Sequence, residues 1–259
     1  MSFTKAETLQ NIQDKLSLFE VPKFFYFSIN DFLLNRKKIL KKITREFNSE
    51  IIVRSSSAQE DGATYSYAGE FESLLNIDPK DLIEVESAIL RVIDSYRHKN
   101  FEKDQIIIQD MVKLISMSGV AFTHDLNNGS PYYVVNYDDQ SGSTDTVTSG
   151  NSEYSNRTLY IYRNAFDKLI SKRFLILIKA IKELETLLDN EFLDIEFALG
   201  LDLKPYLLQV RQISTKRKWK SSSKKLIDTA LRKVSSQIKK DFERSPGVYG
   251  ETTVLGQMP

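Results

Sequence analysis

A β-branched run that ends in an arginine constrains the fold more than any other part of this sequence. Residues 51–53 (Ile-Ile-Val) precede Arg54, and three serines, an acidic pair and a glycine-bearing turn at Ala68–Gly69 follow. The run predicts a strand, and the Ser/Gly-rich stretch predicts a loop after it. A strand that carries a permanent cation, followed by a loop whose N–H groups can turn toward anionic oxygens, suits phosphate binding. An ordinary strand with a polar surface loop explains the same residues, so both interpretations stay open here.

Composition excludes several classes of site. The 259 residues contain no cysteine, which excludes disulfides, zinc–thiolate centres and thiol catalysis. The only histidines are His98 and His124, which argues against a multi-histidine metal site. A net charge of +1 gives no overall field toward nucleic acid or a membrane. We see neither a signal peptide nor the roughly 20 apolar residues that span a bilayer. We therefore expect a cytoplasmic protein that partners neither nucleic acid nor a membrane.

Hydrophobic periodicity predicts alternating helices and strands. The expected helices are 4–18, with Thr4 and Glu7 as a capping box, 31–47, 79–99 and 166–190. The expected strands are 24–29, 51–56, 105–112, 118–125, 131–137, 158–163, 192–199 and 205–213. The three strands between residues 105 and 137 are expected to form an antiparallel meander. The predicted fold class is α+β.

The segment 216–244 has a different character from the rest. It holds eleven Lys/Arg and three acidic residues, a net charge of +8, and its apolar residues recur at helical spacing. We expect a helix that packs on a neighbouring domain. A nucleic-acid patch is the alternative, although aromatic residues are scarce there.

Four polar residues near the C-terminal end form a second candidate site. Asp194 and Glu196 lie two apart on one predicted strand, and Gln209 and Arg211 lie two apart on the next. Because side chains alternate along a strand, each pair shares a face. If the strands pair, two carboxylates, an amide and a guanidinium meet on one surface, which suits Mg²⁺ bound to nucleotide phosphates. A solvated sheet face with cross-strand ion pairs is the alternative.

The order of the segments resembles a known family. VRSSSAQEDG…SYAGEFESLLNI, then IIIQDMV, SGVAFTHD and DIEF…YLLQVRQI, is similar to the N-terminal nucleotide-binding domain of phosphoenolpyruvate synthase and pyruvate phosphate dikinase, over residues 5–215. The resemblance implies the ATP-grasp fold, with ATP and Mg²⁺ held between two α/β lobes. These lobes are expected at 1–104 and 105–215, and 216–259 is expected to lead to further domains of a longer polypeptide.

The resemblance also assigns roles to single residues. Those implied to act on the phosphates and the transferred phosphoryl group are Lys5, Arg54, Asp194 and Arg211. The implied phosphate loop contains Tyr67, Ala68, Gly69 and Ser73. The implied adenine hinge is Gln109, Asp110, Met111 and Val112. The implied Mg²⁺ ligands are Glu196 and Gln209.

Three positions depart from the family pattern. Lys5 lacks the glycines that surround the family's lysine, and a solvated lysine at a helix end is the alternative for it. Asp110 stands where the family has glutamate, and Met111 is equally compatible with plain core. Ser141–Gly142–Ser143 replaces a GLGE-like run, which puts nucleotide preference or phosphate geometry in question.

The resemblance further implies a reaction. ATP gives its β-phosphoryl group to a histidine on a separate carrier domain, AMP and phosphate leave, and the histidine passes the phosphoryl group to an acceptor. Neither His98 nor His124 lies in the Thr-x-His loop of that carrier domain, and His124 is expected to be a surface residue. The chain is thus expected to bind ATP without completing transfer. The terminal segments are closer to the capsule-associated branch that phosphorylates the amide nitrogen of L-glutamine. Pyruvate or another acceptor, and a non-catalytic nucleotide-binding scaffold, are the alternatives.

Overall fold

The computed structural model describes residues 3–57, 73–96, 100, 102–142, 157–213 and 222–244. Tyr67, Ala68, Gly69, His98 and Ser143 lie outside the described residues, and so do residues 216–221 and 245–259 on either side of the basic helix. Within the described part, no helix is both long enough and apolar enough to cross a bilayer.

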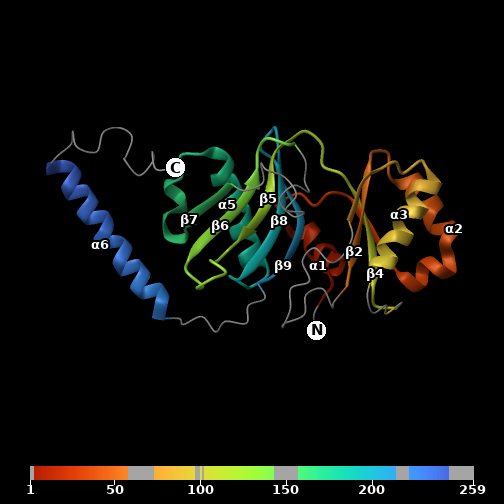
Figure 1. The fold of residues 1–259 in the computed structure, drawn as a ribbon, viewed down its shortest axis with the longest axis horizontal. Coiled ribbons are helices and arrows are strands. Elements are labelled where there is room, and N and C mark those ends of the chain that lie inside the picture. Colours follow the sequence, from red (N-terminus) through yellow and green to blue (C-terminus); the bar gives the residue numbers. More distant parts are fainter. Residues whose placement is uncertain are drawn as a thin grey trace.

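Two antiparallel sheets form the framework (Figure 1). The first has the order β1-β4-β2-β3, with β1 (Phe24–Ser28), β4 (Gln105–Asp110), β2 (Ile51–Ser56) and β3 (Ser73–Ile77). The second has the order β7-β6-β5-β8-β9, with β7 (Arg157–Tyr162), β6 (Tyr132–Asp138), β5 (Ile115–Phe122), β8 (Leu193–Gly200) and β9 (Pro205–Gln212). Helices and two antiparallel sheets make this an α+β fold, as expected.

Two helices cover one face of the first sheet. α2 (Ile29–Glu46) starts at a capping box of Ser28 and Asp31, and α3 (Leu82–Ser95) starts at Asp81, whose carboxylate accepts two helix N–H groups. Their apolar stripes pack on alternate residues of the strands, such as Ile51, Val53, Ile106 and Ile108. The opposite residues of these strands, Arg54 among them, therefore face away from α2 and α3.

The second sheet has its own core. α5 (Lys172–Leu187) packs on it through Leu177, Ile181 and Leu184, against strand residues such as Ile195 and Phe197. The short 3₁₀ helix η2 (Arg163–Lys168) precedes α5, so the helix expected at 166–190 is broken near Leu169.

Helix α1 (Lys5–Ile12), continued by the 3₁₀ turn η1 (Gln13–Lys15), lies between the two sheets (Figure 1). Its Thr4–Glu7 capping box forms as expected. Leu9 and Ile12 are buried in the core of the second sheet, although they come first in the chain. Tertiary contact therefore assigns α1 to the second sheet, and the two sheets do not follow a simple division of the sequence.

Two expectations about the strands need correction. The strand at 105–112 does not join a meander with 118–125 and 131–137, because β4 lies between β1 and β2 in the first sheet. A boundary between the sheets thus falls after Asp110 rather than at residue 105. Ser73, the last residue of the expected phosphate loop, is the first residue of the strand β3.

The basic helix α6 (Ser222–Arg244) forms as expected, and Figure 1 shows it apart from both sheets. Several of its apolar side chains are exposed, including Leu226, Val234 and Ile238. A hydrogen bond of 3.4 Å joins Asn164 to Asp228 on this helix.

Candidate functional site

Arg54 connects the two sheets. It lies at the middle of β2, opposite Ile107 of β4 and Ser73 of β3. Its Nη2 donates to Oε2 of Glu196 at 2.6 Å and to Oε1 of Gln209 at 3.3 Å, and its Nη1 lies 3.4 Å from the carbonyl oxygen of Leu208. The side chains of Arg54 and Glu196 are 13% and 20% exposed. The pair is therefore largely shielded from solvent, where an ion pair is stronger than at the surface.

The register of β8 and β9 produces the expected cluster of four residues. Glu196 pairs with Gln209, and Asp194 pairs with Arg211. Nε of Arg211 donates to Oδ2 of Asp194 at 2.7 Å. The two cross-strand pairs are neighbours on one face of the sheet, because the two residues that each strand contributes are two positions apart. The structure thus brings Arg54, Asp194, Glu196, Gln209 and Arg211 together.

The charges around Glu196 lower the pKa of its carboxyl group. Burial acts in the opposite direction and raises the pKa, but the cations of Arg54, Lys5 and Arg211 and the hydrogen bond from Arg54 outweigh it. Glu196 is thus a carboxylate at neutral pH and within the electrostatic reach of three basic side chains. Such a concentration of positive charge suits a polyanion.

The oxygens of Glu196 and Gln209 fit a divalent cation. Both accept from the same nitrogen of Arg54, so their lone pairs converge on one cationic point. Carboxylate and amide oxygens are hard ligands of the kind that Mg²⁺ takes together with phosphate oxygens. Among the described residues no group of three or more acidic, histidine or cysteine side chains forms a metal site by itself. The donor set therefore fits a metal that substrate phosphates help to hold.

Lys5 approaches the cluster from α1. It is the first residue of the helix, is half-buried, and acts electrostatically on Glu196. Thr4 and Ala6 on either side of it are hydrogen-bonded to the first sheet. Lys5 is therefore held where its charge acts on Glu196, despite the glycine-poor sequence around it.

Gln109 of the expected hinge faces the second sheet. It alternates with Ile108, which packs under α2 and α3, so it points to the same side as Arg54. Its side chain is 2% exposed, and its Nε2 has no hydrogen-bond partner among the described residues. Because an unpaired buried amide nitrogen costs free energy, this donor fits a ligand acceptor between the sheets.

The other hinge residues are engaged differently. Oδ1 of Asp110 accepts from the Ser49 hydroxyl at 3.1 Å. Burial raises the pKa of this carboxyl group, and the Ser49 hydrogen bond and the charge of Lys23 only partly offset that rise. The N–H of Met111 donates to the carbonyl of Glu50, and its sulfur lies 3.0 Å from the N–H of Asn76. The side chain of Asp110 and the N–H of Met111 are thus used within the first sheet, and Val112 is half-buried.

The first two serines after Arg54 lie in β2, as the expected strand at 51–56 implies. Ser55 and Ser56 belong to β2, Ser57 follows, and all three are buried. The hydroxyl of Ser57 donates to Asp104 at 2.6 Å. Ser73 lies beside Arg54 on β3 with an exposed side chain, so it is close to the cluster as a strand residue.

His124 is not a surface residue, contrary to expectation. It is 3% exposed, and its ring stacks on Phe192 with 4.4 Å between centroids. His124 follows β5, which ends at Phe122, and its contact with Phe192 is a tertiary effect that the short FTHD sequence does not reveal. The loop with the altered Ser141–Gly142–Ser143 run follows β6. At its start, Oδ1 of Asp138 accepts hydrogen bonds from the N–H groups of Gln140 and Ser141.

Sequence reasoning missed two residues next to the site, Ser56 and Gln105. Both hold the N-terminal end of α1. The sequence predicted the capping box of Thr4 and Glu7, but no local pattern indicates which strand ends the start of α1 contacts. The contact with Ser56 spans 50 residues of sequence, and the contact with Gln105 spans 101.

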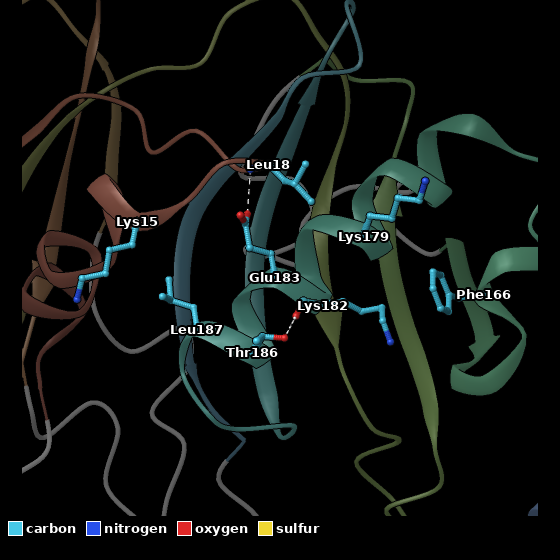
Figure 2. A pocket seen from close by; sticks show the side chains of 8 residues that line it. All are labelled: Lys15, Leu18, Phe166, Lys179, Lys182, Glu183, Thr186 and Leu187. Atoms are coloured by element: carbon cyan, nitrogen blue, oxygen red, sulfur yellow. Dashed lines mark hydrogen bonds between the residues drawn. The ribbon is translucent and has the colours of Figure 1, made fainter.

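A surface pocket lies elsewhere, between η1 and α5 (Figure 2). It has a volume of about 570 Å³ and is lined by Lys15, Leu18, Phe166, Lys179, Lys182, Glu183, Thr186 and Leu187. Figure 2 shows Glu183 pointing from α5 toward Leu18, whose N–H it accepts at 2.9 Å. None of the site residues lines it, because α5 covers the opposite face of the second sheet.

Comparison with solved structures finds ligases and a synthetase at low similarity. An L-amino acid ligase from Bacillus licheniformis aligns with 82% of this chain and 43% of its own, at 15% identity and a TM-score of 0.48. D-alanyl-alanine synthetase A from Vibrio cholerae aligns with 82% of this chain and 55% of its own, at 16% identity and a TM-score of 0.47. D-alanine-D-alanine ligase from Helicobacter pylori aligns with 82% of this chain and 51% of its own, at 13% identity and a TM-score of 0.43. The chain spans about half the length of these structures. No curated protein sequence matches it significantly.

The chain contains an ATP-binding domain of the ATP-grasp fold. A family model described as the AMP/ATP-binding domain of pyruvate phosphate dikinase matches residues 6–138, just over half of the sequence. The chain belongs to this family. The match includes Arg54 and the segment from Gln109 to Val112, and it ends before β8 and β9. The place of Glu196, Gln209 and Arg211 in the site therefore rests on geometry and on the sequence motifs.

Proposed function

We propose that this chain binds Mg²⁺–ATP between its two sheets and prepares it for phosphoryl transfer. The observation that carries the proposal is the contact of Arg54, on the first sheet, with Glu196 and Gln209, on the second. A cation and converging oxygen ligands from opposite sheets meet at one point. That arrangement positions a metal-bound triphosphate and neutralises its charge, which is most of what a phosphoryl-transfer site supplies.

Each side chain has a distinct role in this proposal. Glu196 and Gln209 hold Mg²⁺, which when bound neutralises charge on the phosphate oxygens. Arg54 turns from these two residues to the phosphates, where its planar guanidinium binds oxygens in pairs. Arg211, oriented by Asp194, lies in the next row and stabilises charge on the transferred group. Lys5 adds a third cation.

We propose that the adenine binds at the segment from Gln109 to Val112. The buried Nε2 of Gln109, which has no hydrogen-bond partner among the described residues, supports this as a donor. The phosphate loop, with Tyr67, Ala68 and Gly69, is proposed from the family resemblance, and Ser73 is proposed as a hydroxyl donor to a phosphate oxygen.

The second part of the proposal concerns where the phosphoryl group goes, and it involves a longer polypeptide. We propose that the β-phosphoryl group passes to a histidine on a carrier domain, that AMP is the leaving group, and that water takes the γ-phosphoryl group, which is released as phosphate. His124 is packed on Phe192 in the interior, which does not suit it as a phosphoryl carrier. The terminal segments favour the amide nitrogen of L-glutamine as the final acceptor, with pyruvate as the alternative.

Isothermal titration of the chain with ATP and Mg²⁺ tests the binding step. We expect one ATP per chain, and we expect E196Q to weaken binding about tenfold or more, because it removes a charged metal ligand. E50Q is the matched control, since Glu50 lies at the surface beside Lys113. Absence of binding by the folded chain, or equal affinity of the two variants, would overturn the proposal.

A further inference from the structure

The N-terminal end of α1 meets the first sheet where two strand ends are locked together. Ser56 of β2 and Gln105 of β4 are register partners. The hydroxyl of Tyr96 accepts from the N–H of Ser56 at 2.9 Å and donates to the carbonyl of Gln105 at 2.6 Å. Tyr96 is 4% exposed. The backbones of both residues are therefore fixed by the same buried hydroxyl group.

The side chains of these two residues hold the start of α1. The hydroxyl of Ser56 accepts from the N–H of Ala6 at 3.0 Å. Oε1 of Gln105 accepts from the hydroxyl of Thr4 at 2.7 Å, and its Nε2 donates to Glu7 at 3.2 Å. Gln105 thus contacts both members of the capping box, and Ser56 satisfies one of the N–H groups that a helix start leaves without an intrahelical partner.

Lys5 lies between the two residues, Thr4 and Ala6, that these hydrogen bonds hold. Its neighbours Thr4 and Ala6 are 5% and 0% exposed, and both are hydrogen-bonded to the first sheet. Leu9 of the same helix is buried in the core of the second sheet. The backbone of Lys5 is therefore fixed relative to both sheets, and its charge reaches Glu196. A lysine side chain has high rotamer entropy, so a fixed origin limits the loss when the ammonium binds a phosphate.

We propose that Ser56 and Gln105 are positioning residues, which place Lys5 against the phosphates of the bound nucleotide. The inference rests on the proposed function. It assigns a role in nucleotide binding to two polar residues whose side chains are hydrogen-bonded to the start of α1. It also predicts energetic coupling between Lys5 and Gln105, which are 100 residues apart in the sequence.

A double-mutant cycle tests the coupling. The affinity for Mg²⁺–ATP and the free energy of unfolding in urea are measured for the unaltered chain, Q105A, K5M and the double variant. We expect Q105A to weaken ATP binding about three- to tenfold when Lys5 is present, the effect of one or two hydrogen bonds. In the K5M background we expect no further loss of affinity, while the loss of unfolding free energy stays the same. Q10A, on an exposed position of α1, is the control and should change neither quantity.

Each outcome has a definite meaning. Equal loss of affinity from Q105A in both backgrounds makes the contacts merely structural and overturns the inference. No loss in the presence of Lys5 also overturns it. A K5M variant that binds as tightly as the unaltered chain removes the role of Lys5 and the inference with it, whereas Mg²⁺–ATP binding itself is judged separately by E196Q. The same cycle with S56A gives the answer if Q105A does not fold.

Discussion

At the scale of single residues, Arg54 is the centre of the candidate site. Its guanidinium lies at the point on which the oxygens of Glu196 and Gln209 converge. A metal ion held by the same two oxygens would compete with it, because two cations repel each other at this distance. If Glu196 and Gln209 held Mg²⁺, Arg54 would therefore give up these two oxygens, and the exchange would require the phosphates to become its new partners.

Replacing Arg54 should affect the nucleotide and the metal in opposite directions. We expect R54Q to weaken ATP binding about ten- to a hundredfold, since charge-assisted contacts to phosphate are lost. The same variant should bind Mn²⁺ more tightly in the absence of nucleotide, measured by the electron paramagnetic resonance of free Mn²⁺. R157Q is the matched control, because Arg157 pairs with Asp139 at the edge of the sheet. Unchanged or weaker Mn²⁺ binding by R54Q would contradict the exchange.

At the scale of elements, Glu183 of α5 binds the segment after η1 through hydrogen bonds. Its Oε1 accepts from the N–H of Ser17 at 2.8 Å and from the Ser17 hydroxyl, and its Oε2 accepts from the N–H of Leu18. Burial raises the pKa of this carboxyl group, but these hydrogen bonds outweigh it and lower the pKa below its usual value. The charged form is therefore the one that stabilises the fold.

The stabilisation by Glu183 should depend on pH. A carboxyl group with a lowered pKa stabilises the folded state above its unfolded pKa, near 4.5, and loses this effect as the pH falls through the folded value. At pH 7 we expect E183Q to lower the free energy of unfolding by about 1 kcal/mol, since the hydrogen bonds are partly solvated. The difference should shrink below pH 4.5 in urea titrations. A constant difference from pH 7 to pH 3 would show that charge is not involved.

At the scale of the whole molecule, the two sheets and α1 form the proposed nucleotide-binding unit, and α6 lies apart from both sheets (Figure 1). The apolar side chains of α6 remain exposed, with Leu226 at 70% and Val234 at 54%. Burial of apolar surface is the main source of stability, so α6 contributes little to this unit.

Removal of residues 214–259 should leave the unit intact. We expect the shortened chain to keep its affinity for ATP and to lose less than about 1 kcal/mol of unfolding free energy. Titration with Mg²⁺–ATP and urea unfolding measure the two quantities. A large loss of affinity would instead mean that the basic segment covers the nucleotide.

Local sequence determined much of this protein. The elements follow the periods of apolar residues, the Thr4–Glu7 capping box forms, and Asp194, Glu196, Gln209 and Arg211 share a face because strand side chains alternate. Each of these properties depends on residues within a few positions of one another, where backbone geometry alone sets the relation.

Tertiary structure decided the rest. It placed β4 between β1 and β2, buried α1 in the core of the second sheet, turned His124 inward, and gave Arg54 its partners 142 and 155 residues away. Sheet order and helix docking depend on which apolar faces meet when the whole chain is compact, and a local pattern does not encode that choice. The sequence by itself therefore named most members of the site, whereas only the folded chain decided which of them touch.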